Sequence, residues 1–363
     1  MKIVVQKNNL QKALGFVERV ASKNAALPIL NNVLLKTENG RLLVAATNLE
    51  IGVVSFIGAK ITEEGAIAVP GRILAEFIKG VRSETVELHT KQNTLSVDAG
   101  TMKTAILCFD ASEYPIIPKI NQKIKQTLPV IVLHEMIANI IDSIASSESR
   151  PELAGAFLDF QKGHTVLAAT DSFRLVEQKR ENPSTTPATM IIPRTAVMEL
   201  FRILPDLDGD ITINIDDNQI EFTHNNCQLI SRLVNGRYPD YRKIIPEKII
   251  SKVLVSKEEI ENSVKTTALF SSNISDVKIE CSEDELKVSA KNASKGEAHA
   301  TTKANLKGDP FEIMVNYRYL LDGLKVIPTN NVILEFTGKG SPFVLRPSDD
   351  KKESVYLIMP LRN

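Results

Sequence analysis

The chain has 363 residues, of which 43% are hydrophobic and 24% charged, a composition that is typical of folded proteins and argues against wholesale disorder. Its length is about two to three times the usual domain size of about 100–150 residues, which favours several domains. Lysine and arginine number 44, as do aspartate and glutamate, so the net charge of zero indicates neither an acidic nor a basic partner.

The same inventory favours a cytoplasmic protein. Met1–Lys7 is too short and too polar for a signal peptide, and the apolar runs are far shorter than the roughly 20 residues of a membrane span. The three cysteines are scattered and odd in number, which argues against a disulfide framework or a zinc site.

The first third of the chain predicts a strand at Ile3–Val5 and then an amphipathic helix. The apolar stripe of that helix is formed by Leu10, Leu14, Val17 and Ala21. Glu38-Asn39-Gly40 is typical of a hairpin turn. A second helix is predicted after Pro70, with its apolar face formed by Ile73, Leu74, Phe77, Ile78 and Val81.

The second third follows the same plan. A strand is predicted at Val130–Val132, followed by a helix with the apolar residues Met136, Ile137, Ile140, Ile141 and Ile144. A further helix is predicted from Pro193, with the apolar residues Val197, Leu200, Phe201 and Leu204. Asp216-Asp217-Asn218 indicates a hairpin.

The last third repeats the plan again. A strand at Val253–Val255 precedes a capping box formed by Ser256 and Glu259, and the helix that follows carries Ile260, Val264 and Ala268. Gly338-Lys339-Gly340 indicates a hairpin after a last helix with Tyr317, Leu320, Leu321 and Leu324.

The three thirds share a long-range repeat. Val69 and Ile192, in two similar apolar segments, are 123 positions apart, and Ile192 and Val315 are again 123 apart. Asn48 and Asp171 are also 123 apart, and the Tyr-Pro pairs that begin at Tyr114 and Tyr238 are 124 apart. Several coincidences at one spacing indicate three copies of one domain.

The predicted fold is therefore α+β, with three tandem copies of a domain that packs two helices against an antiparallel sheet. We expect domains at 1–120, 127–246 and 251–363. Their boundaries should fall in the polar, proline-containing stretches at about 118–126 and 246–251.

No catalytic, metal or cofactor site is predicted. The five histidines are scattered, and Gly338-Lys339-Gly340-Ser341 lacks the spacing of a phosphate-binding loop. The paired carboxylates Asp216-Asp217 and Asp349-Asp350 lie beside turn formers or lysines, where solvated turns are expected.

The segments that define the repeat resemble a known family, the bacterial β sliding clamp, which is the DNA polymerase III beta subunit. The resemblance extends over the whole chain in family order and is carried by Ala26–Asn32, Thr47–Glu50, Ala169–Leu175, Pro193-Arg194, Leu233–Arg242 and Tyr356–Arg362.

This resemblance implies a non-enzymatic processivity factor: a head-to-tail homodimer whose ring encircles duplex DNA without reading its sequence. Short apolar peptides of the replicative DNA polymerase and of clamp-loader subunits would tether these partners to the ring. The resemblance puts the dimer joint at Thr104 and Ile106 in the first domain and at Leu269 and Phe270 in the third. Leu269 and Phe270 could instead belong to the core of a monomer.

The helical stretches carry twelve basic and nine acidic residues, an excess that a solvated helix face would also show. On the resemblance, ten of the basic residues are expected to face DNA: Lys12, Arg19, Lys23, Arg72, Lys79, Arg82, Arg194, Arg202, Lys257 and Lys265. The family usually offers an arginine to DNA where this chain has Asn24.

The family's partner-peptide pocket lies between the second and third domains. The matching positions in the second domain and the segment after it are Arg150, Leu153, Thr170, Ser172, Phe173, Arg174, Leu175, Pro239, Lys243 and Ile244. Those in the third domain are Asn316, Tyr319, Pro342, Leu357, Ile358, Met359, Pro360, Leu361 and Arg362. Phe173 replaces the histidine or polar residue common in the family, which should make the pocket more apolar.

Two other functions stay open at this point. The chain could be a scaffolding paralogue of the same fold that does not load on DNA, or an enzyme with a site between domains. No convergent group of titratable residues favours the enzyme.

Overall fold

The structure is a computed structural model, and it describes residues 1–21, 27–118, 120–147, 149–182, 186–349 and 353–361. Lys23 and Arg362, which the resemblance assigned to DNA and peptide contacts, lie outside the described residues, as does Asn24, which stands where the family usually has an arginine.

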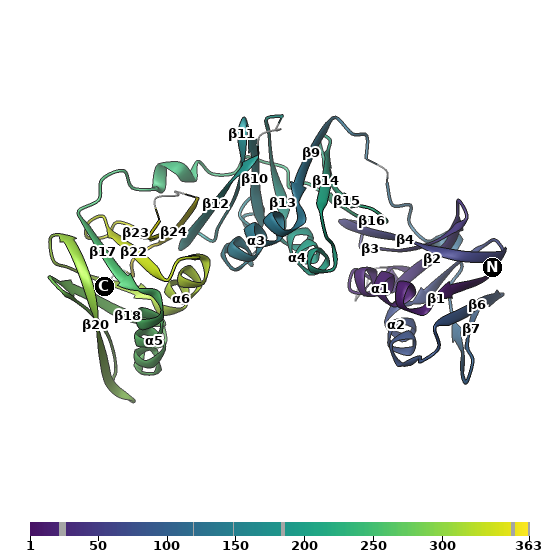
Figure 1. Cartoon of the computed structure of the whole chain (residues 1–363), viewed down its shortest axis with the longest axis horizontal. Helices are drawn as coiled ribbons and strands as arrows, with labels where there is room; N and C mark the ends of the chain where they lie inside the picture. Colours follow the sequence, from purple (N-terminus) through teal and green to yellow (C-terminus); the bar gives the residue numbers. More distant parts are fainter. Residues whose placement is uncertain (22–26, 119, 148, 183–185, 350–352, 362–363) are drawn as a thin grey trace. The chain divides into compact units, whose positions relative to one another are not determined.

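Each third of the described chain has the same order of elements, a strand, a helix, four strands, a second helix and three strands (Figure 1). The first copy consists of β1 (Lys2–Gln6), α1 (Lys7–Val17), β2 (Asn32–Glu38), β3 (Arg41–Thr47), β4 (Ile51–Glu63), β5 (Ala66–Pro70), α2 (Gly71–Gly80), β6 (Thr85–Lys91), β7 (Thr94–Ala99) and β8 (Met102–Leu107).

The other two copies repeat this order. The second consists of β9 (Ile124–Pro129), α3 (Val130–Ile140), β10 (Gly155–Gln161), β11 (Gly163–Thr170), β12 (Arg174–Asn182), β13 (Ala188–Pro193), α4 (Arg194–Ile203), β14 (Asp210–Ile215), β15 (Gln219–His224) and β16 (Cys227–Arg232). The third consists of β17 (Ser251–Ser256), α5 (Lys257–Thr267), β18 (Asp276–Ser282), β19 (Glu285–Asn292), β20 (Gly296–Gly308), β21 (Phe311–Asn316), α6 (Tyr317–Val326), β22 (Asn331–Phe336), β23 (Phe343–Pro347) and β24 (Ser354–Ile358).

Contacts group the chain into two compact units that divide the second copy. The first unit comprises Met1–Ile131 and Met198–Leu233, and the second comprises Val132–Val197 and Val234–Asn363. Each unit contains one continuous antiparallel sheet, and each sheet joins strands of two successive copies.

In the first unit the strand order is β8-β7-β6-β1-β4-β16-β15-β14-β9, with β3, β2 and β5 branching from β4. The long strand β4 makes this possible. Its residues 52–58 pair with β3 on one edge, its residues 51–55 pair with β16 on the other, and residues 59–63 pair with β1. The β4–β16 pair is the joint between the first and second copies.

In the second unit the order is β13-β10-β11-β12-β24-β23-β22-β17-β20-β19-β18-β21. Here β12 pairs with β11 on one edge and with β24 on the other, which joins the second and third copies. The long strand β20 pairs with β19 through residues 296–303 and with β17 through residues 304–308.

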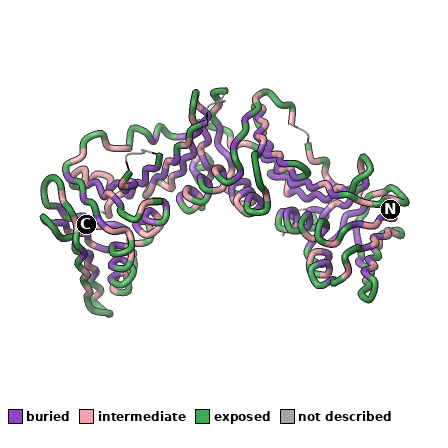
Figure 2. The backbone as a smooth tube through the Cα atoms, in the orientation of Figure 1, coloured by how far each residue is buried: buried purple, intermediate pink, exposed green. Residues whose placement is uncertain are grey.

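The helices cover one face of these sheets in pairs. Helices α1 and α2 lie side by side, and α1 packs on β3 and β4 (Figure 1). The predicted stripe residues Leu10, Leu14 and Val17 are fully buried. Helix α5 packs on β19 and β20 beside α6, and Figure 2 shows that buried residues follow the strands while the connecting turns are exposed. No helix in the described part of the chain is long and apolar enough to cross a membrane.

Most predicted signals lie where the sequence puts them. Asn39 and Gly40 both have positive φ, 50° and 73°, in the turn between β2 and β3, as a tight hairpin requires. The Ser256 side chain accepts a hydrogen bond from the Glu259 amide at the start of α5, which confirms the predicted cap.

Two predictions are wrong. Val130–Val132 is not a strand but the first turn of α3, because the strand before that helix is β9, which ends at Pro129. The 123-residue spacing from Ile3–Val5 indicates β9, whereas the apolar run alone suggested the wrong segment. Ile73 is 58% exposed and does not share the buried face of α2, since Leu74 and Ile78, four residues apart, already fill that face.

Candidate partner-peptide pocket and nucleic-acid interface

The candidate peptide residues gather around the β12–β24 pair in the second unit. Arg174 of β12 lies opposite Ile358 of β24. Beyond the end of β24, the Met359 amide donates to the Phe173 carbonyl at 2.8 Å, and the Leu361 amide donates to the Met314 carbonyl at 2.8 Å. The backbone therefore fixes the C-terminal segment both to the second copy and to β21 of its own copy.

A buried apolar cluster supports this segment. Leu153, Leu175 and Leu357 pack with Tyr238 and Tyr241, and Met359 packs against the cluster while staying half-buried. Leu357 and Ile358 are 1% and 0% exposed. These two residues have almost no surface to offer a ligand, so they form the base of the candidate site, and Met359, Pro360 and Leu361 are its accessible part.

Aromatic and aliphatic side chains form the exposed rim. Phe173 is 60% exposed and stacks on Tyr319 of α6, with ring centroids 6.5 Å apart. Ile244, in the short 3-10 helix η5 (Tyr241–Ile244), is 49% exposed. Arg150 donates to the Ser172 hydroxyl at 3.0 Å. Phe173 thus adds an apolar surface to the rim.

Arg174 belongs to an internal network. Its guanidinium pairs with Asp171 at 3.0 Å and with Asp322 of α6 at 2.6 Å, donates to the Asp142 carbonyl, and lies 4.6 Å from the centre of the Tyr319 ring. The side chain is only 11% exposed. Arg174 therefore links the second copy to the third through an ion pair, a role that its sequence position alone did not indicate.

The other candidate positions mainly shape the backbone. The Thr170 hydroxyl donates to the Arg174 carbonyl, the Pro342 carbonyl accepts from Thr337, and Asn316 caps α6 by accepting from the Arg318 amide. Lys243 forms an ion pair with Asp240, and Pro239 is exposed in the same segment.

Sequence reasoning missed a second network beside the pocket. The Tyr241 hydroxyl donates to Glu177 at 2.6 Å, and Arg242 pairs with Asp159 at 3.0 Å and with Glu177 at 3.6 Å. The Tyr241 ring packs against Phe157, with centroids 6.0 Å apart. The Tyr-Pro repeat marks this segment, but the buried Asp159 and the half-buried Glu177 lie on separate strands and give no signal in the linear sequence.

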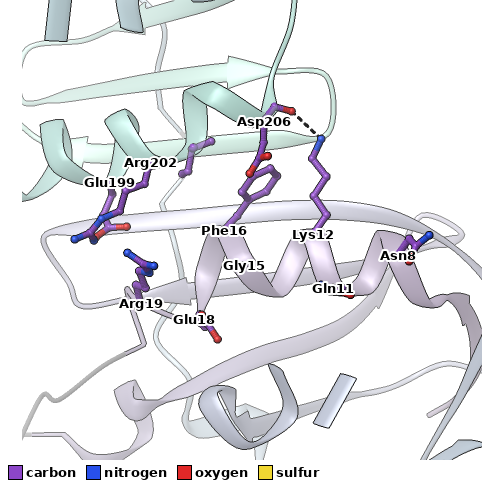
Figure 3. A pocket seen from close by; sticks show the side chains of 11 residues that line it. Asn8, Gln11, Lys12, Gly15, Phe16, Glu18, Arg19, Glu199, Arg202 and Asp206 are labelled. Carbon is purple, nitrogen blue, oxygen red and sulfur yellow. Dashed lines mark hydrogen bonds and ion pairs between the residues drawn. The ribbon is translucent and has the colours of Figure 1, made fainter. Parts of the chain in front are cut away.

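Three of the predicted DNA-facing residues, Lys12, Arg19 and Arg202, line one cavity of about 630 Å³ in the first unit (Figure 3). Acidic groups line the same cavity. Lys12 donates to the Asp206 carbonyl at 2.7 Å, and Arg202 pairs with Glu199. The charge of Arg202 is therefore balanced by an ion pair, whereas Lys12 is held by a backbone carbonyl.

The remaining basic residues lie on other helices. Arg72, Lys79 and Arg82 are exposed on or just after α2. Arg194 is the first residue of α4, Lys257 donates to the Ile327 carbonyl at 2.8 Å, and Lys265 pairs with Glu261 at 2.5 Å. Of these residues, Lys265 is paired with an acid, and Lys257 is held by a backbone carbonyl.

The predicted joint residues lie on the free edge of β8 or beside the start of β20, although the Ile106 side chain itself is only 4% exposed. Thr104 and Ile106 belong to β8, the last strand of the first unit's sheet, which pairs only with β7 among the described strands. Leu269 is 67% exposed in the 3-10 helix η6 (Ala268–Phe270). Phe270 lies about 3.8 Å from the position that a Cβ of Gly296 would take, at the start of β20.

The described residues hold no group of three histidine, cysteine, aspartate or glutamate side chains that could bind a metal ion. Cys108, Cys227 and Cys281 are free and buried. Burial raises the pKa of Cys108 and of Cys281 to about 11 and that of Cys227 to about 12, so these thiols are unreactive near neutral pH.

Three tandem copies of a two-helix, antiparallel-sheet domain, joined edge to edge, define the DNA-clamp class of proteins. Nearly the whole chain matches known sequence families. Residues 1–118, 127–240 and 242–362 match the N-terminal, central and C-terminal domains of the DNA polymerase III beta subunit. The chain belongs to the DNA polymerase III beta subunit family.

Individual relatives agree with this assignment. The beta sliding clamp of Staphylococcus epidermidis is 27% identical over 377 residues, covering 100% of this chain and 99% of that relative. The crystal structure of the beta subunit of Thermotoga maritima has a TM-score of 0.96 at 26% identity and covers 100% of this chain and 99% of its own. The sliding clamp of Bacillus subtilis has a TM-score of 0.95 at 26% identity, with coverage of 100% and 99%.

The family assignment decides the function class. The chain acts in DNA replication as a sliding clamp, which gives DNA polymerase its processivity and is not an enzyme.

Proposed function

We propose that two chains close head to tail into a ring that encircles duplex DNA without reading its sequence. The ring would act in the cytoplasm and tether the replicative polymerase and clamp-loader subunits through the candidate peptide pocket. Its domains would be residues 1–120, 127–246 and 251–363, so that six copies of one domain form the ring.

One observation carries the proposal: the chain contains two copies of the same joint and the separated halves of a third. In the order of elements, β8, β16 and β24 are equivalent strands, and so are β4, β12 and β20. Strand β16 pairs with β4, and β24 pairs with β12. Strand β8 and residues 296–303 of β20 each keep one edge without a partner among the described strands.

The two internal joints have the same register. The copies can be aligned at their helix starts and then strand by strand along the hairpin registers. This alignment gives an offset of 127 residues between β16 and β24, and of 123 residues between β4 and β12. On this numbering, the pair Leu229–Val53 of the first joint corresponds to the pair Tyr356–Val176 of the second. Two independent joints in one chain therefore follow one geometric rule.

The same rule predicts the third joint. Strand β8 precedes β16 by 125 positions, and β20 follows β12 by 122. The register then sets Thr104 of one chain opposite Ala298 of the next, and Ile106 opposite Gly296. Because Phe270 lies beside Gly296, this register brings together Ile106 and Phe270, two residues that the family resemblance assigned to the joint.

A head-to-tail joint of this kind is heterologous, and such joints make closed rings when the rotation allows. Closure also removes the two free strand edges, which are otherwise templates for aggregation. A ring that holds DNA by topology needs few close phosphate contacts, in keeping with the local ion pairs of Arg202 and Lys265 and the hydrogen bond of Lys12 to a backbone carbonyl. The ten basic residues would supply weak, salt-dependent attraction.

The peptide pocket would bind partners through apolar side chains. Met359, Phe173 and Ile244 offer accessible apolar surface above the buried cluster of Leu153, Leu175 and Leu357. A flexible methionine suits a surface that accepts several peptides. A dimer would carry two such pockets, which raises the effective affinity for a bivalent partner.

Retention on DNA of different topology tests encirclement. The protein is loaded by a clamp loader and nucleotide onto nicked circular DNA, the circle is then cut once, and the bound protein is measured by gel filtration before and after. The proposal predicts retention on circles and loss from linear DNA. Equal retention on both would mean ordinary binding, and a dimer that never loads would favour the scaffolding paralogue.

A further inference from the structure

A second groove lies at the joint between the first and second copies, inside the first unit. It has a volume of about 640 Å³ and is lined by residues of β2, β3, β4 and β5 of the first copy and of β15 and β16 of the second. Its apolar lining includes Leu34, Ala45, Val54, Phe56 and Ile230. The segment 111–118 forms one wall. None of these residues belongs to the candidate partner-peptide pocket.

The internal repeat shows what such a groove can hold. At the second joint, the repeat spacing makes Phe157 equivalent to Leu34, Ala168 equivalent to Ala45, and Leu357 equivalent to Ile230. That groove is filled from within the chain by Tyr241, which is 2% exposed and packs in the same cluster as Ala168 and Leu357. Arg242 follows directly and pairs with the carboxylates of Asp159 and Glu177.

At the first joint the filling residues are missing. The positions equivalent to Tyr241 and Arg242 are Ile117 and Pro118. Ile117 packs over Gly52, with its Cγ2 only 2.9 Å from where a Cβ of Gly52 would lie, and this contact keeps the backbone of the wall in place. Neither residue supplies an aromatic ring or a cation, and the groove stays open beside Ile116, which is 93% exposed.

The positions equivalent to Asp159 and Glu177 are Lys36 and Val54, but two other carboxylates line the open groove. Glu38 and Glu221 both line it, together with one lysine, Lys36, which pairs with Glu38 at 3.2 Å. Glu221 is 8% exposed and accepts a hydrogen bond from Asn214 at 2.7 Å. The groove therefore combines an apolar base with one excess negative charge, which complements an apolar group attached to a cation.

We propose that this groove is a second docking site, which binds a peptide of another protein carrying an aromatic residue followed directly by arginine or lysine. The aromatic ring would lie on Ala45 and Ile230, which are equivalent to the Ala168 and Leu357 that pack with Tyr241, and on Val54, which stands where Glu177 does. The cation would pair with Glu38 in competition with Lys36, which already pairs with that carboxylate. The proposal does not depend on ring closure or on the partner-peptide pocket.

A peptide that reproduces residues 237–245 of the chain is the probe, because this segment fills the equivalent groove in cis. The peptide is labelled with fluorescein and titrated with the full-length protein in a fluorescence polarisation assay. We expect saturable binding. Peptides with alanine in place of the tyrosine at 241 or the arginine at 242 should bind about tenfold more weakly, as expected for losing one buried ring or one charge pair.

Protein variants locate the binding site. Ala66→Trp at the exposed rim and Glu38→Lys should each weaken binding about tenfold, whereas Glu63→Lys, an exposed charge change outside the groove, should not. The variant that lacks residues 359–363 should bind the probe normally. The proposal is overturned if the probe does not bind saturably, if all groove variants bind equally, or if only the truncation abolishes binding.

Discussion

The Arg174 guanidinium of β12 donates a 2.6 Å hydrogen bond to the Asp322 carboxylate of α6, and so a residue of the second copy is tied to a helix of the third. The same guanidinium lies over the Tyr319 ring, which stacks on Phe173. One buried cation thus fixes both the joint between copies and the aromatic rim of the candidate pocket. We therefore expect substitution of Arg174 to lower the stability of this joint even when no ligand is bound.

Arg174→Ala should weaken the β12–β24 joint. Asp322 and Asp171 would keep their charges at partly buried positions, and such a loss costs about 2–4 kcal/mol after allowance for residual exposure. Hydrogen exchange of the β24 amides measures the cost as faster local opening. Lys179→Ala, an exposed change on the same strand, is the control. Unchanged protection of the β24 amides in Arg174→Ala would show that the Arg174 ion pairs do not stabilise the joint.

Tyr114 should make stability depend on alkaline pH. Burial raises the pKa of Tyr114 to about 12, and its hydroxyl donates to the Asn32 carbonyl. An unfolded tyrosine has a pKa of about 10, so the folded state binds this proton more tightly. The resulting stability, about 2–3 kcal/mol, is present below pH 10 and is lost as the pH rises from about 10 to 12.

Thermal denaturation at pH 8, 10 and 11.5 tests this expectation against Tyr114→Phe. The variant should be less stable at pH 8, by about 1 kcal/mol for the lost hydrogen bonds, but should lose less stability above pH 10. Burial also raises the pKa of Tyr238, Tyr241 and Tyr356, so both proteins should lose stability, and the difference between them is the test. Parallel curves would contradict the assignment to Tyr114.

Leu269→Asp should convert the proposed dimer into monomers. The side chain is 67% exposed in the single chain, so the change leaves the core intact while it puts a charge into an apolar joint. Light scattering measures the mass. Ile274→Asp, at a residue 58% exposed in the same copy, is a matched control that should stay dimeric. A dimeric Leu269→Asp protein would show that Leu269 does not lie at the joint.

Removal of residues 359–363 should abolish binding of partner peptides and spare the fold. The truncation ends after β24, so the β12–β24 pairs remain. The hydrogen bonds of Met359 with Phe173 and of Leu361 with Met314 disappear, together with the packing of Met359 on the buried cluster. Circular dichroism should be unchanged. A truncated protein that binds a clamp-loader or polymerase peptide with normal affinity would refute the assignment of the pocket.

The sequence predicted the repeat, because positions that define a domain recur at fixed spacing whatever their detailed packing. It also predicted the caps and hairpins, whose chemistry is local: Ser256 and Asn39-Gly40 act on their immediate neighbours. It failed at Val130–Val132, where an apolar run looks alike in a strand and in a helix.

The candidate site was only partly accessible to sequence reasoning. The family pattern named Arg174 and Leu357, but pattern alone could not tell a rim residue from a buried one, and Leu357 is buried. The pairing of Arg242 with Asp159 depends on how the segment after β16 returns to β10, and the open groove beside Ile230 depends on the strand register between copies. Distances along the chain encode neither.

Directed disulfide cross-linking tests the ring most directly, since the internal joints fix the register of the missing one. Thr104→Cys and Ala298→Cys are combined in one chain and oxidised, and the product is examined by denaturing electrophoresis. The native thiols are buried and should not compete. We predict a covalent dimer that stays linked to nicked circular DNA in detergent after loading, whereas Thr104→Cys with Lys307→Cys, at the other end of β20, gives monomers. Monomers from the first pair, or equal yields from both, would contradict the account.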